Sequence, residues 1–247
     1  EELLGLPVAL NTYCMYINLD KLNEKGISPP LDVSWTYDEF VEKLKNFKQV
    51  SEDNDIIKEY GLLSPLDIGN YNIWGIMLSD GGELINSKRL YYNFYGEKAL
   101  GGLEKLIDLK FEYGILPDFF GVISDEIAWE MFYKQQNVAV YIGNSRIMEY
   151  LDSQYKSGEG FNFDVANFPT GNKDLPTILS NGIVSYGVIK DEDPKKVEMC
   201  IKFLKYLTRD SNQKTLENIG LFTVKTDIKD MYMDNIKMKR LEEGLEH

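Results

Sequence analysis

A chain of 247 residues, 43% of them hydrophobic, is long enough for one large domain or for two lobes with real cores. Asp and Glu outnumber Lys and Arg by 40 to 27, and the resulting net charge of −13 argues against a nucleic-acid or anionic-membrane partner. Two cysteines are too few for a disulfide framework or a thiolate metal cage, and the single histidine, at the last position, excludes His-based triads and His metal sites.

The first half of the chain alternates extended and helical patterns. Residues 7–18 are rich in β-forming side chains. Thr36 and Glu39 have the spacing of a capping box, in which each side chain bonds the backbone N–H of the other residue. The sequence therefore predicts a strand over 7–18, a helix from 36, a buried strand over 60–63, a helix from 72 that ends at 80–82, and a strand over 90–94.

The second half continues this alternation. Leu100, Leu103, Ile107 and Phe111 recur at helical spacing, which predicts an amphipathic helix. Ser124 and the Asp193-Pro194 pair are typical helix starts. Further helices are expected over 124–132, 144–155 and 194–207, with strands over 138–142, 163–168 and 182–189. Strands that alternate with helices predict an α/β sheet covered by helices.

Six short motifs follow one another along nearly the whole chain. They are Gly5-Leu6-Pro7 with Tyr16-Ile17-Asn18-Leu19-Asp20; Trp35-Thr36-Tyr37-Asp38-Glu39-Phe40; Trp74 with Asp80-Gly81-Gly82; Tyr133 to Val140; Phe163-Asp164-Val165-Ala166 with Pro169-Thr170-Gly171; and Gly187-Val188-Ile189, Asp193-Pro194 and Phe203 to Thr208. In this order and spacing they resemble the extracellular solute-binding proteins of bacterial ABC importers, in particular the maltose-type sugar receptors.

The resemblance implies a periplasmic binding protein-like α/β fold of type II, with two lobes joined by crossing strands. It assigns residues 1–17 to a hinge strand and the end of a first-lobe segment, 18–180 to the second lobe, and 181–244 to a return into an incomplete first lobe. Residues 245–247 resemble the start of an affinity tag. Family members carry about a hundred residues before the position of Glu1, so we expect this sequence to be the middle part of a longer protein.

The function implied by the resemblance is that of a receptor subunit, not of an enzyme, and it needs no cofactor or metal. Such a receptor closes over a small solute by hinge motion and delivers it to ABC permease subunits. The implied location is extracellular, as a cell-surface lipoprotein or in the periplasm, although no export signal occurs in this sequence. The expected solute is a sugar or an oligosaccharide.

A sugar site needs flat apolar surface for the ring and converging hydrogen-bond groups for the hydroxyls. The resemblance places such groups on the hinge strand, on the loop before Trp74, after the 138–142 strand and at the second crossing of the hinge. The expected ligand-binding residues are Asn11, Thr12, Tyr13, Asn70, Tyr71, Arg146, Ser180 and Asn181.

Two positions depart from the family pattern. Gln136 replaces the glycine before the 138–142 strand, which makes Asn137 the expected left-handed residue of that turn. Arg146 aligns with an aromatic residue of sugar binders, which points to an anionic solute or to hydroxyls suited to a charged donor.

Alternative functions stay open on the residues alone. The 40 acidic residues offer many pairs for a two-carboxylate glycosidase, and a membrane-tethered sensor would need the same binding lobes without transport. If the first lobe is incomplete, its strands and apolar faces are uncovered, so we expect weak solute binding and self-association.

Overall fold

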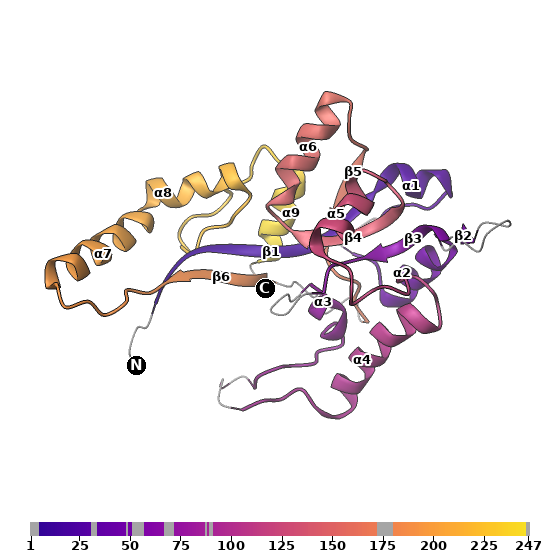
Figure 1. The fold of residues 1–247 in the computed structure, drawn as a ribbon, viewed down its shortest axis with the longest axis horizontal. Helices are drawn as coiled ribbons and strands as arrows, with labels where there is room; N and C mark the ends of the chain where they lie inside the picture. Colours follow the sequence, from indigo (N-terminus) through magenta and orange to yellow (C-terminus); the bar gives the residue numbers. More distant parts are fainter. Residues whose placement is uncertain are drawn as a thin grey trace. The chain divides into compact units, whose positions relative to one another are not determined.

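The computed structural model describes residues 5–30, 34–47, 49–50, 57–66, 72–86, 88, 91–171 and 180–245. Figure 1 shows an α/β fold built from these segments. The strands are β1 (Leu6–Asn18), β2 (Gln49–Val50), β3 (Ile57–Leu63), β4 (Val138–Asn144), β5 (Phe163–Ala166) and β6 (Ser180–Tyr186). The helices are α1 (Leu19–Glu24), α2 (Tyr37–Leu44), η1 (Lys45–Phe47), α3 (Trp74–Met77), α4 (Gly96–Phe111), α5 (Asp125–Tyr133), α6 (Ile147–Ser157), α7 (Pro194–Leu207), α8 (Asp210–Lys214), η2 (Thr215–Ile219) and α9 (Ile236–Gly244).

The chain divides into two compact units. The first unit contains Glu1–Tyr13, Asn144–Tyr150 and Ser180–His247, and the second contains Cys14–Gly143 and Leu151–Leu179. The chain therefore passes between the units within β1, at the end of β4, within α6 and just before β6.

The second unit is built on a mixed sheet. The strand order is β2-β3-β4-β1-β5, with β3 and β4 parallel and β1 and β5 antiparallel. Residues 138–143 of β4 are all buried, as expected for a central strand that is covered on both faces. In the same unit Phe132 stacks on Tyr141 at 5.2 Å and packs edge-on against Phe161, also at 5.2 Å.

Two predicted helix starts of this unit, at Thr36 and at Ser124, are confirmed, whereas the helix expected from 72 to 80–82 is only the four-residue α3. Thr36 accepts from the backbone N–H of Glu39 at 3.3 Å, and the Glu39 carboxylate accepts from the backbone N–H of Thr36 at 2.9 Å. Phe40 and Leu44 of α2 and Phe47 of η1 are fully buried, so this segment packs on the core through one apolar face. Ser124 caps α5 by accepting from the N–H of Ile127.

Helix α4 has the predicted position but not the expected burial. Its apolar stripe, which contains Leu100, Leu103, Ile107 and Phe111, is exposed. The buried face instead carries Ala99, Gly102 and Leu109, and at Gly102 the helix lies so close to α3 that an added Cβ would be 2.0 Å from the Met77 carbonyl oxygen. Helical spacing predicted the helix correctly but could not tell which face meets a neighbour.

Two local predictions are wrong. The turn before β4 places Gln136, not Asn137, in the left-handed region, at φ 51°. Asn137 continues into the sheet, where its carbonyl accepts from the N–H of Tyr60 at 2.9 Å, so the preceding residue makes the turn. The expected strand over 90–94 is also absent from the described residues, where a single bridge joins Ile85 and Tyr92.

The first unit contains the antiparallel pair β1 and β6, which lie side by side in Figure 1. Asp193 caps α7 with Pro194 at its first turn, as predicted. None of the residues of α7 is buried, and Cys200 on this helix is exposed. Cys14, in the second unit, is fully buried, and this desolvation raises the pKa of its thiol to about 12.

Candidate functional site

Six of the eight expected ligand-binding residues belong to the first unit, and all six lie close to the points where the chain passes between units. The first-unit part of β1 ends with Asn11, Thr12 and Tyr13. Arg146 lies in residues 144–150, a short stretch that belongs to the first unit, and β6 begins with Ser180 and Asn181. Asn70 and Tyr71 lie outside the described residues.

The β1 residues differ in accessibility. Thr12 is 2% exposed, whereas Asn11 and Tyr13 are half-buried. The backbone of Thr12 is in register with Ser180 of β6, so the two expected contact segments on these strands are direct neighbours. The side chains of Ser180 and Asn181 lie outside the described residues.

Arg146 directly precedes α6 and is exposed. Its backbone N–H donates to the Asn144 side-chain oxygen at 3.1 Å, which orders the turn between β4 and α6. Arg146 therefore extends from an ordered turn, and its guanidinium is accessible to solvent. An accessible guanidinium can bind a carboxylate or phosphate through two hydrogen bonds.

Ser145 was not among the predicted ligand-binding residues, but it contacts two of them and directly precedes a third. Its backbone N–H donates to the Thr12 carbonyl at 2.8 Å, and its hydroxyl donates to the Gly220 carbonyl at 2.6 Å. The same Oγ lies 3.3 Å from Oδ1 of Asn11. Ser145 is fully buried, so it joins Asn11, Thr12 and Arg146 without being accessible itself.

Gly220 is the second residue that the sequence reasoning missed. It has φ 67° at the end of η2, and a Cβ on it would lie 2.9 Å from the Ser145 carbonyl oxygen and 3.0 Å from the Arg146 Cα. Glycine is common in the left-handed position directly after a helix, but no helix was predicted over residues 215–219. The approach of Gly220 to Ser145 is decided by tertiary structure alone.

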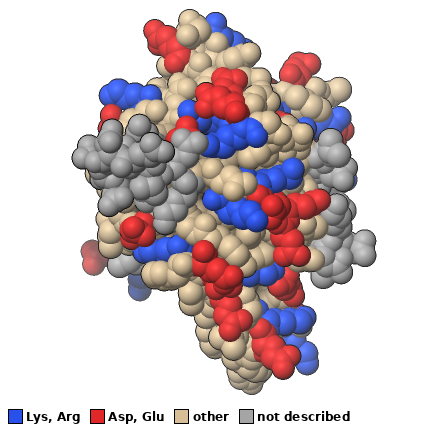
Figure 2. Space-filling model, turned by 90° about the vertical axis from the view of Figure 1, so that its right-hand side faces the viewer, with Lys and Arg blue, Asp and Glu red and all other residues tan. Residues whose placement is uncertain are grey.

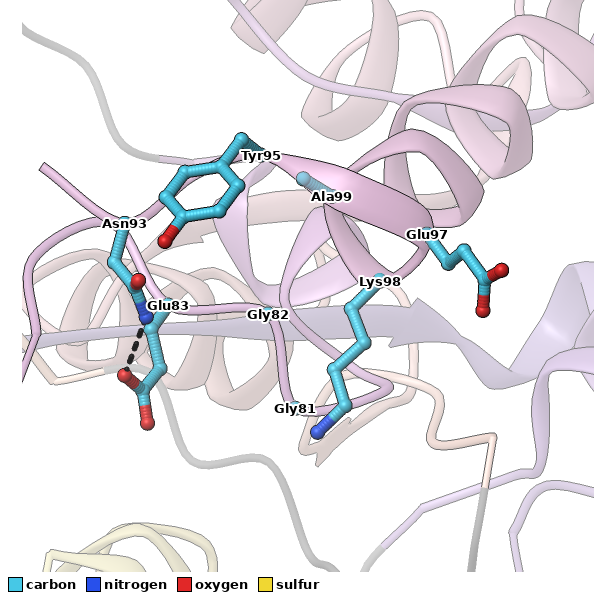
Figure 3. A pocket seen from close by; sticks show the side chains of 8 residues that line it. All are labelled: Gly81, Gly82, Glu83, Asn93, Tyr95, Glu97, Lys98 and Ala99. Carbon is cyan, nitrogen blue, oxygen red and sulfur yellow. Dashed lines mark hydrogen bonds between the residues drawn. The ribbon is translucent and has the colours of Figure 1, made fainter.

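Two surface hollows lie away from these residues. One, of about 330 Å³ in the second unit, is lined by Tyr95, Lys98 and the glycines 81 and 82, and Asn93 donates to Glu83 there at 2.9 Å (Figure 3). The other, of about 980 Å³ in the first unit, runs along α7 and the segment 186–191. Neither contains an expected ligand-binding residue.

The described residues contain no group of three or more His, Cys, Asp or Glu side chains that could hold a metal ion. Figure 2 shows basic and acidic side chains interspersed on one face of the molecule. Among the described residues, no helix is both long enough and apolar enough to cross a membrane.

The fold is shared with known structures. The maltose/maltodextrin-binding domain MalE of Bdellovibrio bacteriovorus, bound to maltotriose, has a TM-score of 0.73 at 18% identity, over 98% of this chain and 60% of that one. UgpB of Mycobacterium tuberculosis, in complex with glycerophosphocholine, has a TM-score of 0.73 at 18% identity, over 98% and 58%. Maltose-bound MalE3 of T. maritima has a TM-score of 0.72 at 20% identity, over 96% and 59%.

These similarities define the fold class as that of the type II periplasmic binding proteins. The sequence profile of the bacterial extracellular solute-binding proteins matches residues 2–214, and the chain belongs to this family. No curated protein sequence matches it significantly. The chain spans about 60% of the length of the structures that it resembles.

Proposed function

We propose that this protein is the solute-binding receptor of an ABC import system, that it takes a sugar or a related polar solute outside the membrane, and that it closes over this solute by hinge motion. The observation that carries the proposal is the position of the expected ligand-binding residues. Asn11, Arg146 and Ser180 belong to three separate segments, and each segment lies where the chain passes between the two units. A hinge closure changes the surroundings of residues at such positions more than those elsewhere.

The solute class follows from Arg146. We propose a solute with an anionic group, such as a carboxylate or a phosphodiester, or with hydroxyls that accept from a charged donor. The sugar-bound and glycerophosphocholine-bound relatives support both forms of this proposal, because a polyhydroxylated or phosphate-bearing solute fits the same fold.

The test is a binding panel that contains neutral oligosaccharides, acidic oligosaccharides and glycerophosphodiesters, read by thermal shift and calorimetry. If part of the site lies outside this chain, affinity falls toward the millimolar range, so the panel should extend to millimolar ligand. Stabilisation by acidic solutes that Arg146→Ala removes and Arg146→Lys weakens supports the proposal. Stabilisation by neutral sugars alone, unaffected by Arg146→Ala, contradicts it.

Tyr71 provides a second test of the sugar site. An aromatic ring stacked on a sugar contributes about 1–3 kcal/mol of binding free energy, so Tyr71→Ala should weaken binding by that amount with little loss of fold stability. Equal affinity of the wild type and Tyr71→Ala would remove this residue from the site.

Two other functions are separated by direct assays. A glycosidase would release reducing sugar from the panel, and one Asp or Glu substitution would abolish that turnover. A sensor would bind the same solutes, but its gene would lie beside a signalling gene instead of genes for permease subunits. Binding without turnover, with permease genes adjacent, favours the receptor.

A further inference from the structure

We propose that Ser145 is a positioning residue for solute binding: it holds Asn11 and Arg146 in their binding geometry without touching the solute. This inference rests on the proposed function. All of the contacts that carry it lie within the first unit, whose segments 10–13, 144–146 and 220–222 come from distant parts of the chain.

The first step is that the 220–222 segment is fixed to β1. Leu10 and Phe222 exchange two backbone hydrogen bonds, of 2.8 Å from the Leu10 N–H and 2.9 Å from the Phe222 N–H. Gln213, which is 1% exposed, bonds the Val8 carbonyl and accepts from the N–H of Val224, so the flanking residues are held as well. The Gly220 carbonyl therefore has a defined position relative to β1.

The second step is that Ser145 joins segment 144–146 to both of these fixed elements. Its hydroxyl donates to Gly220 and its N–H to Thr12, so two hydrogen bonds from one residue fix the turn that carries Arg146. The absence of a Cβ at Gly220 allows the Ser145 carbonyl and the Arg146 Cα to approach its backbone closely.

The third step concerns the residues that meet the solute. Asn11 is half-buried, and its Oδ1 lies 3.3 Å from the Ser145 Oγ, where it can accept a second, longer share of the hydroxyl proton that donates to Gly220 at 2.6 Å. Arg146 is the next residue in the chain and is exposed. Ser145 itself is fully buried, so removal of its hydroxyl acts on the solute only through these two neighbours. A small displacement of a positioned binding group is sufficient for a large loss of affinity.

The test compares Ser145→Ala with Ser79→Ala in the 247-residue chain. Ser79 is also a buried serine, at 1% exposure, but it lies in the second unit, where its hydroxyl accepts from Lys105 at 3.3 Å. We expect Ser145→Ala to raise the Kd of the solute found in the panel by about tenfold, and Ser79→Ala to change it less than about twofold. In the Arg146→Ala background the effect of Ser145→Ala should shrink, because the two residues act as one unit.

Amide hydrogen exchange makes this test independent of solute binding. Ser145→Ala should speed exchange at residues 144–146 and 220–222 and leave the amides of β3 and of residues 138–142 in β4 unchanged. If Ser145→Ala leaves the Kd unchanged, or raises it equally with and without Arg146→Ala, the positioning role is overturned. The proposed function still stands in that case, because the wild type binds the solute. If the wild type binds no solute in the panel, the proposed function fails, and unchanged exchange at 144–146 then overturns the positioning role on its own.

Discussion

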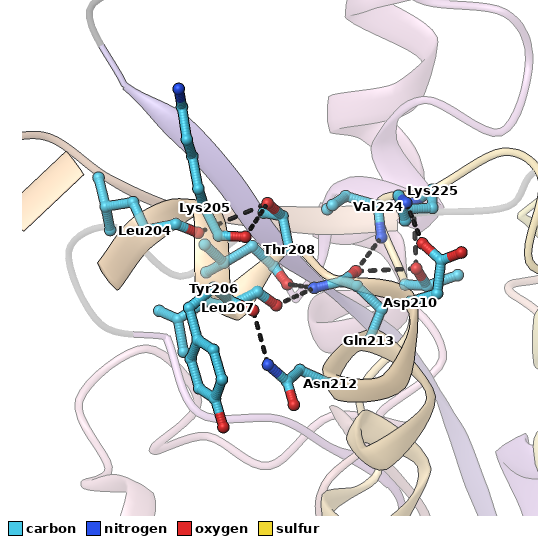
Figure 4. A network of polar contacts seen from close by, with 12 residues as sticks. Leu204, Lys205, Tyr206, Leu207, Thr208, Asp210, Asn212, Gln213, Val224 and Lys225 are labelled. Atoms are coloured by element: carbon cyan, nitrogen blue, oxygen red, sulfur yellow. Dashed lines mark hydrogen bonds and ion pairs between the residues drawn. The ribbon is translucent and has the colours of Figure 1, made fainter. Parts of the chain in front are cut away.

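The side-chain amide of Gln213 donates a hydrogen bond of 2.8 Å to the carbonyl of Val8, 205 residues away in the sequence. The same nitrogen donates to the Leu207 carbonyl at 3.1 Å, and the amide oxygen accepts from the Thr223 hydroxyl at 2.8 Å and from the Val224 N–H at 3.1 Å (Figure 4). One buried side chain thus joins β1, the end of α7 and the 223–224 segment of the first unit.

Gln213→Ala should therefore destabilise the first unit by about 2–4 kcal/mol, because it leaves several buried polar groups without partners. Urea unfolding followed by circular dichroism measures this loss. Gln135, an exposed glutamine, is the matched control, and Gln135→Ala should change stability by less than about 0.5 kcal/mol. Equal stabilities of the two variants would show that water replaces the Gln213 bonds.

Two adjacent glycines of α4 should respond oppositely to the same substitution. A Cβ on Gly102 would lie 2.0 Å from the Met77 carbonyl oxygen of α3, whereas a Cβ on Gly101 has no atom within 4 Å. Gly101→Ala should stabilise the protein by about 0.5–1 kcal/mol through helix propensity. Gly102→Ala should destabilise it by about 1–3 kcal/mol, because α3 and α4 must move apart. Shifts of the same sign in thermal unfolding would contradict the observed packing of these helices.

Glu59 gives the second unit a pH-dependent stability. Burial alone would raise the pKa of Glu59, but hydrogen bonds from Lys21 at 2.9 Å and from Lys25 at 3.2 Å outweigh it and hold the pKa below the ordinary value of 4.5. A carboxylate with a lowered folded-state pKa stabilises the fold above its unfolded-state pKa, and this stabilisation is lost as the pH falls through the folded-state value.

Glu59→Gln should consequently cost about 1–3 kcal/mol at neutral pH, with a difference from wild type that shrinks as the pH falls below about 4.5. Urea unfolding of both proteins between neutral and acidic pH measures it. Glu42, whose exposed carboxylate pairs with Lys45, is the control, and Glu42→Gln should cost less than about 1 kcal/mol at every pH. A cost for Glu59→Gln that does not change with pH would assign its role to packing.

The uncovered faces of the first unit predict self-association. Phe203 and Met199 on α7 are 59% and 63% exposed, and Ile183 on β6 is 62% exposed. Such apolar surface in water favours contact with a second copy. Light scattering should show a mass that rises with concentration, and Phe203→Ser should reduce this rise. Val122→Ser, at an even more exposed position of the second unit, is the control. A monomer at every concentration would contradict the prediction.

Much of the local structure was determined by the sequence itself. The Thr36–Glu39 capping box, the Ser124 cap and the Asp193-Pro194 start all use side chains within three residues of the helix end, so the information is local. The buried strand β4 was equally predictable, because a continuous apolar run needs cover on both faces. The ordered motifs gave the family, which the profile match over residues 2–214 confirms.

Tertiary structure alone decided which faces and which distant residues meet. The apolar stripe of α4 faces outward because the glycine side fits closely against α3, and Gln136 makes the left-handed turn because Asn137 is bonded to β3. Ser145 and Gly220 are separated by 75 residues, and neither has a side chain that suggests a role. Their contact exists because β1 fixes both segments in the first unit, and a hydrogen bond between distant residues depends on that folding and not on any local pattern.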